Sequence, residues 1–149
     1  MSSINTSMPV STPAIRFGAR HSVTDLAAVR SAVEDTFGED AAKNVTANTI
    51  KAAPKGVLGM LRSVAASLVT SRVNGGFSQY SVTRFDSAEE RDKAWQNKLD
   101  TWGGPNIQVR EKTDDRYVFG DRSLGVDFVV SLAKQGDDSI VLINQASRR

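Results

Sequence analysis

The sequence predicts an α+β fold in which helices come first and a strand, a helix and a four-stranded antiparallel meander follow. In the first half, apolar residues recur at helical spacing. From residue 77 onward, β-branched and aromatic runs alternate with turn residues, and the short connections predict hairpins. We expect a disordered tail over residues 1–20 and a single domain over residues 21–149, with a helical part at 22–74 and a sheet part at 77–147.

The helical part is predicted from capping residues and helix terminators. Thr24 can cap a first helix that Gly38 ends. Residues 39–53 predict a weaker helix, which must stop before Pro54 because the residue before a proline is pushed away from helical geometry. Residues 57–73 carry one apolar stripe and predict a helix that packs on the core rather than on a membrane surface.

The sheet part is predicted from strand alternation and one strongly amphipathic helix. Residues 77–85 suit a strand, and Asp86 or Ser87 then caps a helix whose apolar stripe contains Trp95 and Trp102. Further strands are expected at 107–112, 116–120, 124–133 and 139–146. We expect a curved antiparallel sheet that holds the Trp95 helix in its concavity and buries Trp95 in the core.

This order of elements is similar to the cystatin-like roll and to the cone-shaped fold of nuclear transport factors. The resemblance covers the arrangement of elements and includes no shared motif. Because such scaffolds host both enzymes and binding proteins, the resemblance implies a fold and no particular activity.

The composition excludes most common catalytic centres. The chain has no cysteine, which excludes disulfides, thiol nucleophiles and cysteine metal ligands. Its one histidine, His21, is flanked by Arg20 and Ser22 and has no orienting acid beside it in the sequence, so we expect a solvated residue ahead of the first helix. Neither a phosphate-binding glycine loop nor metal-ligand spacing occurs, so we expect no cofactor and no metal, and an enzyme is less expected than a binding protein.

Asp127 differs from the other acids because it lies inside a predicted strand rather than in a turn. A buried carboxyl there would have a raised pKa and could act as an acid or base. Strand alternation instead favours a position on the solvent-facing side of a half-exposed sheet, and this is the interpretation we prefer.

The charge pattern favours a soluble protein that does not bind nucleic acid. The net charge is +2 and acids and bases are interleaved, so the basic face of a nucleic-acid-binding domain is not expected. The apolar run at 57–73 is interrupted by polar residues and predicts no membrane span. The cytoplasm is the expected compartment. Residues 1–18, however, are polar and free of acids and resemble the leaders of type III secreted effectors, so export without a cleaved signal is the alternative.

Three hypotheses of function follow. The leading one is a non-enzymatic protein-interaction module that engages another protein, or a second copy in a homodimer, through a sheet face or an exposed edge strand. The alternative is a small-molecule pocket, or a cofactor-free enzyme of cone-shaped type, between the sheet and the Trp95 helix, with Tyr80, Trp95, Arg110 and Asp127 as ligand-binding residues. The third is a secreted effector with a polar leader.

Overall fold

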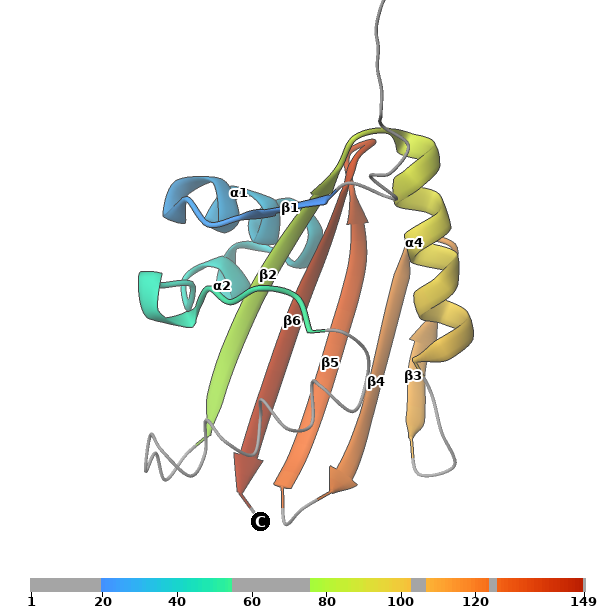
Figure 1. Ribbon diagram of the computed structural model, residues 1–149. Coiled ribbons are helices and arrows are strands. Elements are labelled where there is room, and N and C mark those ends of the chain that lie inside the picture. Colours follow the sequence, from blue (N-terminus) through green and yellow to red (C-terminus); the bar gives the residue numbers. More distant parts are fainter. Residues whose placement is uncertain (1–19, 55–75, 103–106, 124–125, 149) are drawn as a thin grey trace, which may run out of the picture.

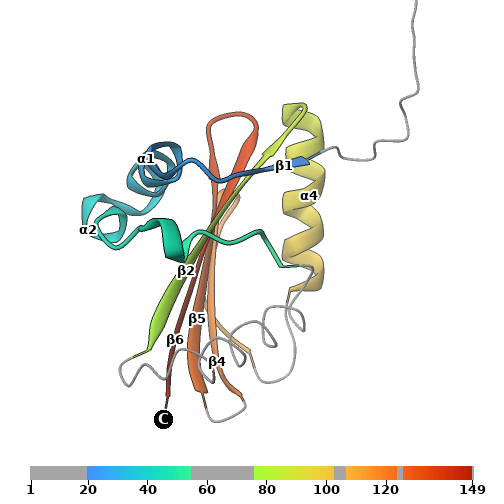
Figure 2. The ribbon, with the colours of Figure 1, turned by 60° about the vertical axis from the view of Figure 1, so that its left-hand side comes forward.

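The computed structural model describes residues 20–54, 76–102, 107–123 and 126–148. In these ranges the chain forms an open six-stranded antiparallel sheet with helices on both faces (Figures 1 and 2). The predicted tail up to residue 19 and the predicted helix at 57–73 lie outside the described residues. Within the described ranges, no helix is long and apolar enough to cross a membrane.

Apart from a short first strand, helices precede the main strands and a meander comes last, as the sequence predicts. In chain order they are β1 (Arg20–Val23), α1 (Leu26–Phe37), α2 (Glu39–Ala42), the 3-10 helix η3 (Ala47–Thr49), β2 (Phe77–Phe85), α4 (Ala88–Thr101), β3 (Gln108–Lys112), β4 (Arg116–Ser123), β5 (Val126–Gln135) and β6 (Ser139–Arg148). The strand order is β1-β2-β6-β5-β4-β3. The predicted meander is therefore confirmed, and β2 lies beside its last strand.

The N-terminal end of the described chain differs from the prediction, which placed solvated coil and the start of a helix there. Instead β1 pairs with β2, with Val23 opposite Val82. The first helix begins at Leu26, and its cap is Asp25, which accepts a hydrogen bond from the Ala28 N–H at 2.9 Å. A four-residue strand is too short to show alternation, so the pairing partner determines its structure.

The predicted helix over residues 39–53 is also wrong over most of its length. α2 ends at Ala42, and η3 covers only three residues further on. Ile50 then bridges Tyr80, and the Lys51 N–H donates to the Tyr80 carbonyl at 2.9 Å. Asn and Thr side chains compete with helical backbone bonds, and the free edge of β2 offers this segment an alternative partner.

Two separate hydrophobic clusters form on the two faces of the sheet. Figure 2 shows α4 on one face and α1 with α2 on the other; we call these the α4 face and the α1 face. The α4-face cluster comprises Phe85, Trp95, Trp102, Tyr117, Phe119, Phe128, Val130, Leu132, Ile140, Leu142 and Ala146. The α1-face cluster comprises Val29, Ala32, Val33, Ala42, Val45, Tyr80, Val82, Val141 and Ile143. Alternate residues of the central strands thus fill opposite cores.

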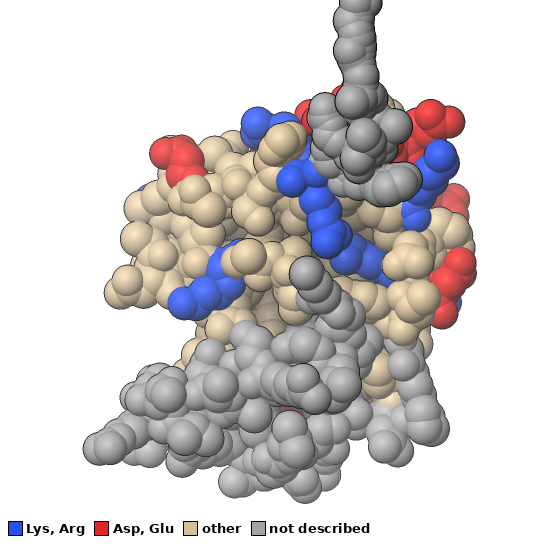
Figure 3. Space-filling view, viewed as in Figure 1, with Lys and Arg blue, Asp and Glu red and all other residues tan. Residues whose placement is uncertain are grey.

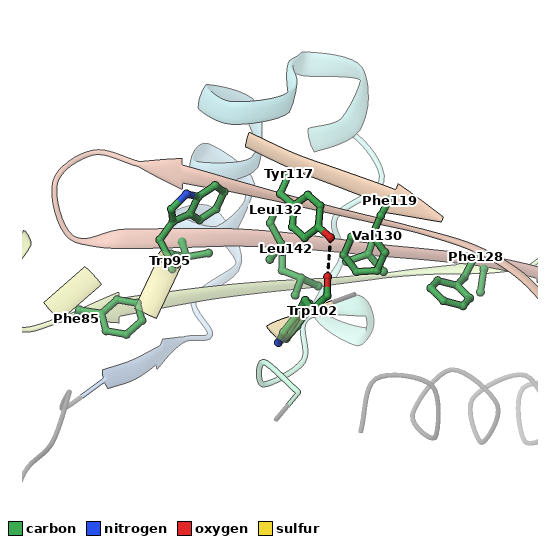
Figure 4. Packing of buried hydrophobic residues seen from close by; sticks show 11 residues of the cluster. Phe85, Trp95, Trp102, Tyr117, Phe119, Phe128, Val130, Leu132 and Leu142 are labelled. Carbon is green, nitrogen blue, oxygen red and sulfur yellow. Dashed lines mark hydrogen bonds between the residues drawn. The ribbon is translucent and has the colours of Figure 1, made fainter. Parts of the chain in front are cut away.

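The helix α4 is fixed to the sheet by aromatic packing and by polar contacts at both ends. Ser87 caps it and accepts a hydrogen bond from the Glu90 N–H at 3.1 Å. Trp95 is 3% exposed, so its predicted place in the core is confirmed. Beyond the last turn, the Tyr117 hydroxyl donates to the Trp102 carbonyl at 2.6 Å (Figure 4). Arg91 donates to backbone carbonyls near the turn between β5 and β6.

Candidate interaction edge

The four residues predicted to bind a ligand do not share one face of the sheet. Trp95 belongs to the α4-face cluster, whereas Tyr80 belongs to the α1-face cluster. Asp127 is half-buried and precedes Phe128 of the α4-face cluster, so alternation directs it to the α1 face. Arg110 also lies on the α1 face, because its guanidinium lies over Gly120 of the neighbouring strand. The sheet therefore separates Trp95 from the other three.

The most exposed strand of the sheet is β3, at the end of the strand order. All five of its residues are exposed along a strand that pairs, among the described residues, with β4 alone (Figure 1). Val109 is 53% exposed. An outermost strand presents backbone N–H and C=O groups that no neighbouring strand satisfies, and these groups can pair with another chain.

At the opposite end of the sheet, the short outermost strand β1, exposed at three of its four residues, and a second segment cover parts of the longer strand β2. One part of the β2 edge pairs with β1, from Arg20 opposite Phe85 to Val23 opposite Val82. A neighbouring part meets the bridge from Ile50 and the hydrogen bond from Lys51. The chain thus places two segments along β2, whereas the described residues place none along the outer side of β3.

A β-bulge in β3 determines where its charged side chains point. The register with β4 shifts between Val109 and Glu111, which makes Arg110 the extra residue. A Cβ atom built on Gly120 would lie 3.1 Å from Arg110 Nη2. Gly120 follows Phe119 of the α4-face cluster, so this Cβ would point to the α1 face. The Arg110 guanidinium therefore lies on the α1 face, in space left by the missing side chain.

The residues next to Arg110 follow from their partners on β4. Glu111 lies opposite Val118, whose neighbours on both sides belong to the α4-face cluster, so Glu111 also points to the α1 face. Val109 and Lys112 lie opposite members of that cluster and point to the α4 face. Lys112 Nζ accordingly lies 5.5 Å from the centre of the Tyr117 ring. Along β3 the two central charges thus share one face and their neighbours share the other.

His21 meets an acid that is distant in the sequence. Its Nε2 lies 3.3 Å from Oδ1 of Asp86, a contact that the residues flanking His21 in the sequence do not indicate. The side chains are 66% and 53% exposed. Water therefore screens this pair, and it lacks the desolvated surroundings that strengthen a catalytic dyad.

A second feature that sequence reasoning missed is the amine of Lys98. Burial, and in addition the nearby charge of Arg20, lower the pKa of Lys98 to about 8. Its Nζ lies 4.5 Å from the centre of the Trp102 ring. Figure 3 shows Lys and Arg side chains across the middle of the visible face, with acids toward its margins. The sequence signal was the position of Lys98 one helical turn before a buried tryptophan.

Asn144 is a third polar residue in an unexpected place. It is 2% exposed, and its side-chain oxygen has no hydrogen-bond partner among the residues that the structure describes. It alternates with Leu142 and Ala146 of the α4-face cluster and lies opposite the buried Gln79. An asparagine at an apolar position of an alternating strand was the signal that could have indicated it.

Over the ranges that the structure covers, no group of three or more His, Cys, Asp or Glu side chains is placed to hold a metal ion.

Comparison of the chain with models of protein families, with curated proteins and with solved structures finds no match.

Proposed function

We propose that the protein is a non-enzymatic interaction module that binds an extended segment of a partner along β3. The observation that carries this proposal is the contrast between β2, whose edge is partly covered by other segments, and β3, which has no segment along its outer side among the described residues. Two segments of the chain line β2, whereas all five residues of β3 are exposed. Strand addition would satisfy the outward backbone groups of β3 and extend the sheet by one strand.

The side chains of β3 support selective rather than indiscriminate pairing. Charged residues and bulges on an edge strand oppose nonspecific stacking of flat sheets. Here the bulge directs Arg110 and Glu111 to one face and leaves the exposed Val109 on the other. A bound strand would meet an apolar contact on one face and a pair of opposite charges on the other. In strand addition, main-chain bonds supply affinity and such side-chain contacts supply specificity.

The test selects extended peptides from a random displayed library on the immobilised full chain. The affinity of the selected peptides should fall about tenfold or more in the variant Val109→Lys, because this variant puts a charge into the apolar contact. Such a fall corresponds to a loss of about 1.4 kcal/mol or more of binding free energy. The matched control is Gln145→Lys, an exposed residue on the α1 face of β6. Peptides with alternate backbone amides N-methylated should also lose binding, because the ladder needs those N–H groups. Binding that resists both changes and falls with Gln145→Lys would place the site on the sheet face and refute the proposal.

A second candidate function is the binding of a small polar ligand on the α4 face. The observation that favours it is Asn144, whose buried oxygen has no hydrogen-bond donor within the described ranges. Ser81 and Thr83 of β2 are also buried on this face, in line with the cluster member Phe85. A ligand N–H or O–H could satisfy the oxygen, and a cone-like packing of the sheet around α4 is part of this second proposal.

This second function is tested by thermal shift with a panel of small amides and polyols. A ligand bound at Asn144 should raise the melting temperature of the wild-type chain. The effect should vanish in Asn144→Leu, which has no acceptor, and persist in Val109→Lys. Equal shifts in the wild type and Asn144→Leu would exclude this site.

A further inference from the structure

We propose that the segment bound along β3 is β3 of a second copy of this chain. The two strands would run antiparallel about a two-fold axis, with Arg110 of each copy opposite Glu111 of the other. This inference rests on the proposed function, since it names the partner for the same edge. It commits to one register, which the arrangement of faces and charges on β3 selects.

A regular strand could not adopt this register. Residues directly opposite each other in an antiparallel pair have side chains on the same face. In a strictly alternating strand, adjacent residues point to opposite faces. A two-fold pair would then place a residue opposite its own copy. Centred on Arg110 or on Glu111, such a pair would bring two like charges together, which is destabilising.

The bulge removes this restriction. Because Arg110 is the extra residue, Arg110 and Glu111 both point to the α1 face. Val109 and Lys112 on either side both point to the α4 face. The sequence of faces along the strand is therefore the same in both directions from its centre between Arg110 and Glu111. A two-fold axis through this centre matches each of the four residues from Val109 to Lys112 with a partner on its own face.

The charges in this register are complementary. In the dimer the Arg110 side chain turns outward from its place over Gly120 and meets Glu111 of the second copy, and by symmetry the contact occurs twice. Cβ atoms of directly opposite residues lie about 4.5–5.5 Å apart, within reach of a guanidinium and a carboxylate. On the other face, Val109 meets Lys112 of the second copy, whose aliphatic stem can cover the exposed valine. The register thus pairs unlike charges and shields the apolar residue of the edge.

The expected dimer is small and reversible. A single five-residue strand contributes the ladder, so the interface is at the low end of the range for specific complexes. Dissociation is therefore expected in the micromolar range or above, and the measurement must cover a concentration series. The full chain is used, because its folding does not depend on the exposed side chains that the variants change.

The experiment is sedimentation velocity of the full chain over a series from about 1 µM to 1 mM, which brackets weak association. The wild type should form a dimer as concentration rises. Arg110→Glu and Glu111→Arg each turn both ion pairs into like-charge pairs and should weaken the dimer about tenfold or more, a loss of about 1.4 kcal/mol or more. The double swap Arg110→Glu with Glu111→Arg restores opposite charges and should return the dissociation constant to within about threefold of the wild type.

The controls separate this inference from the proposed function. Unchanged circular dichroism and melting temperature in the variants show that the fold is intact. A wild type that stays monomeric at all concentrations, or a dimer unaffected by the single charge reversals, overturns the self-pairing. So does a double swap that remains as weak as the single variants. If selected peptides still depend on Val109 while the chain is monomeric, strand addition at β3 stands and only the second copy as partner is refuted.

Discussion

The Arg110 guanidinium of β3 lies beside Gly120 of β4, where a Cβ atom would be 3.1 Å from Nη2. The same Cβ would be 2.9 Å from the Phe128 carbonyl oxygen of β5. Because Gly120 has no side chain, the Arg110 guanidinium of β3 and the Phe128 carbonyl of β5 can both lie close to it. The bulge at Arg110 turns the long side chain inward over β4, into this space.

Gly120→Ala is expected to lower the free energy of unfolding by about 1–3 kcal/mol, the usual cost of overpacking. The Arg110 side chain can move aside, but the Phe128 carbonyl belongs to the backbone. Most of the loss should therefore persist in the double variant Arg110→Ala with Gly120→Ala. Urea denaturation of the single and double variants measures this, and a complete recovery in the double variant would show that the guanidinium is the main obstacle.

Trp95→Ala is expected to lower the free energy of unfolding by about 3–5 kcal/mol, because it empties a large volume in the α4-face cluster. The matched control is Val109→Ala, an exposed apolar residue, which should change stability by no more than about 0.5 kcal/mol. Thermal and urea denaturation measure both. Equal effects of the two substitutions would contradict the placement of α4 against the sheet.

Asn144→Leu is expected to raise the free energy of unfolding by about 1–2 kcal/mol, because it removes a buried acceptor to which no described residue donates. Gln145→Leu, on the same strand but exposed, should be nearly neutral. The comparison is made by urea denaturation without added ligand. A loss of stability in Asn144→Leu would mean that the side chain gains a hydrogen bond in solution.

Lys98 should make stability depend on pH in the alkaline range. Its folded pKa of about 8 lies below the ordinary value of 10.5, so between these values the unfolded chain holds one more proton. Stability from this residue therefore rises with pH over that window. The free energy of unfolding of Lys98→Met minus that of the wild type should therefore be larger at pH 7 than at pH 10. Because both proteins contain the same tyrosines, their ionisation cancels in this difference. Lys93→Met, at an exposed position of α4, is the control and should show no such trend.

The elements that sequence analysis predicted well carry their own local signal. β2 matches the predicted strand over Phe77–Phe85, because β-branched and aromatic residues fill it. α4 follows from its cap at Ser87 and from a stripe containing Trp95. The strands of the meander were found from alternation and turns, although β4 and β6 continue past their expected ends and β5 ends later than expected.

The parts that were missed depend on contacts between distant segments. β1 and the residues after η3 have no periodic pattern and owe their conformation to the edge of β2. The predicted ligand residues were assigned to one site without knowledge of the register. A bulge at Arg110 cannot be read from composition, because its position depends on pairing with β4. The same holds for the contact of His21 with Asp86.

The measurement that tests strand addition most directly is amide hydrogen exchange of the full chain, with and without the selected peptides. Binding along β3 should slow exchange at backbone amides within Gln108–Lys112 and leave the exposed segments of α1 and α2 unchanged. Protection confined to the α1 face around Gln145, with unchanged exchange throughout β3, would contradict the account.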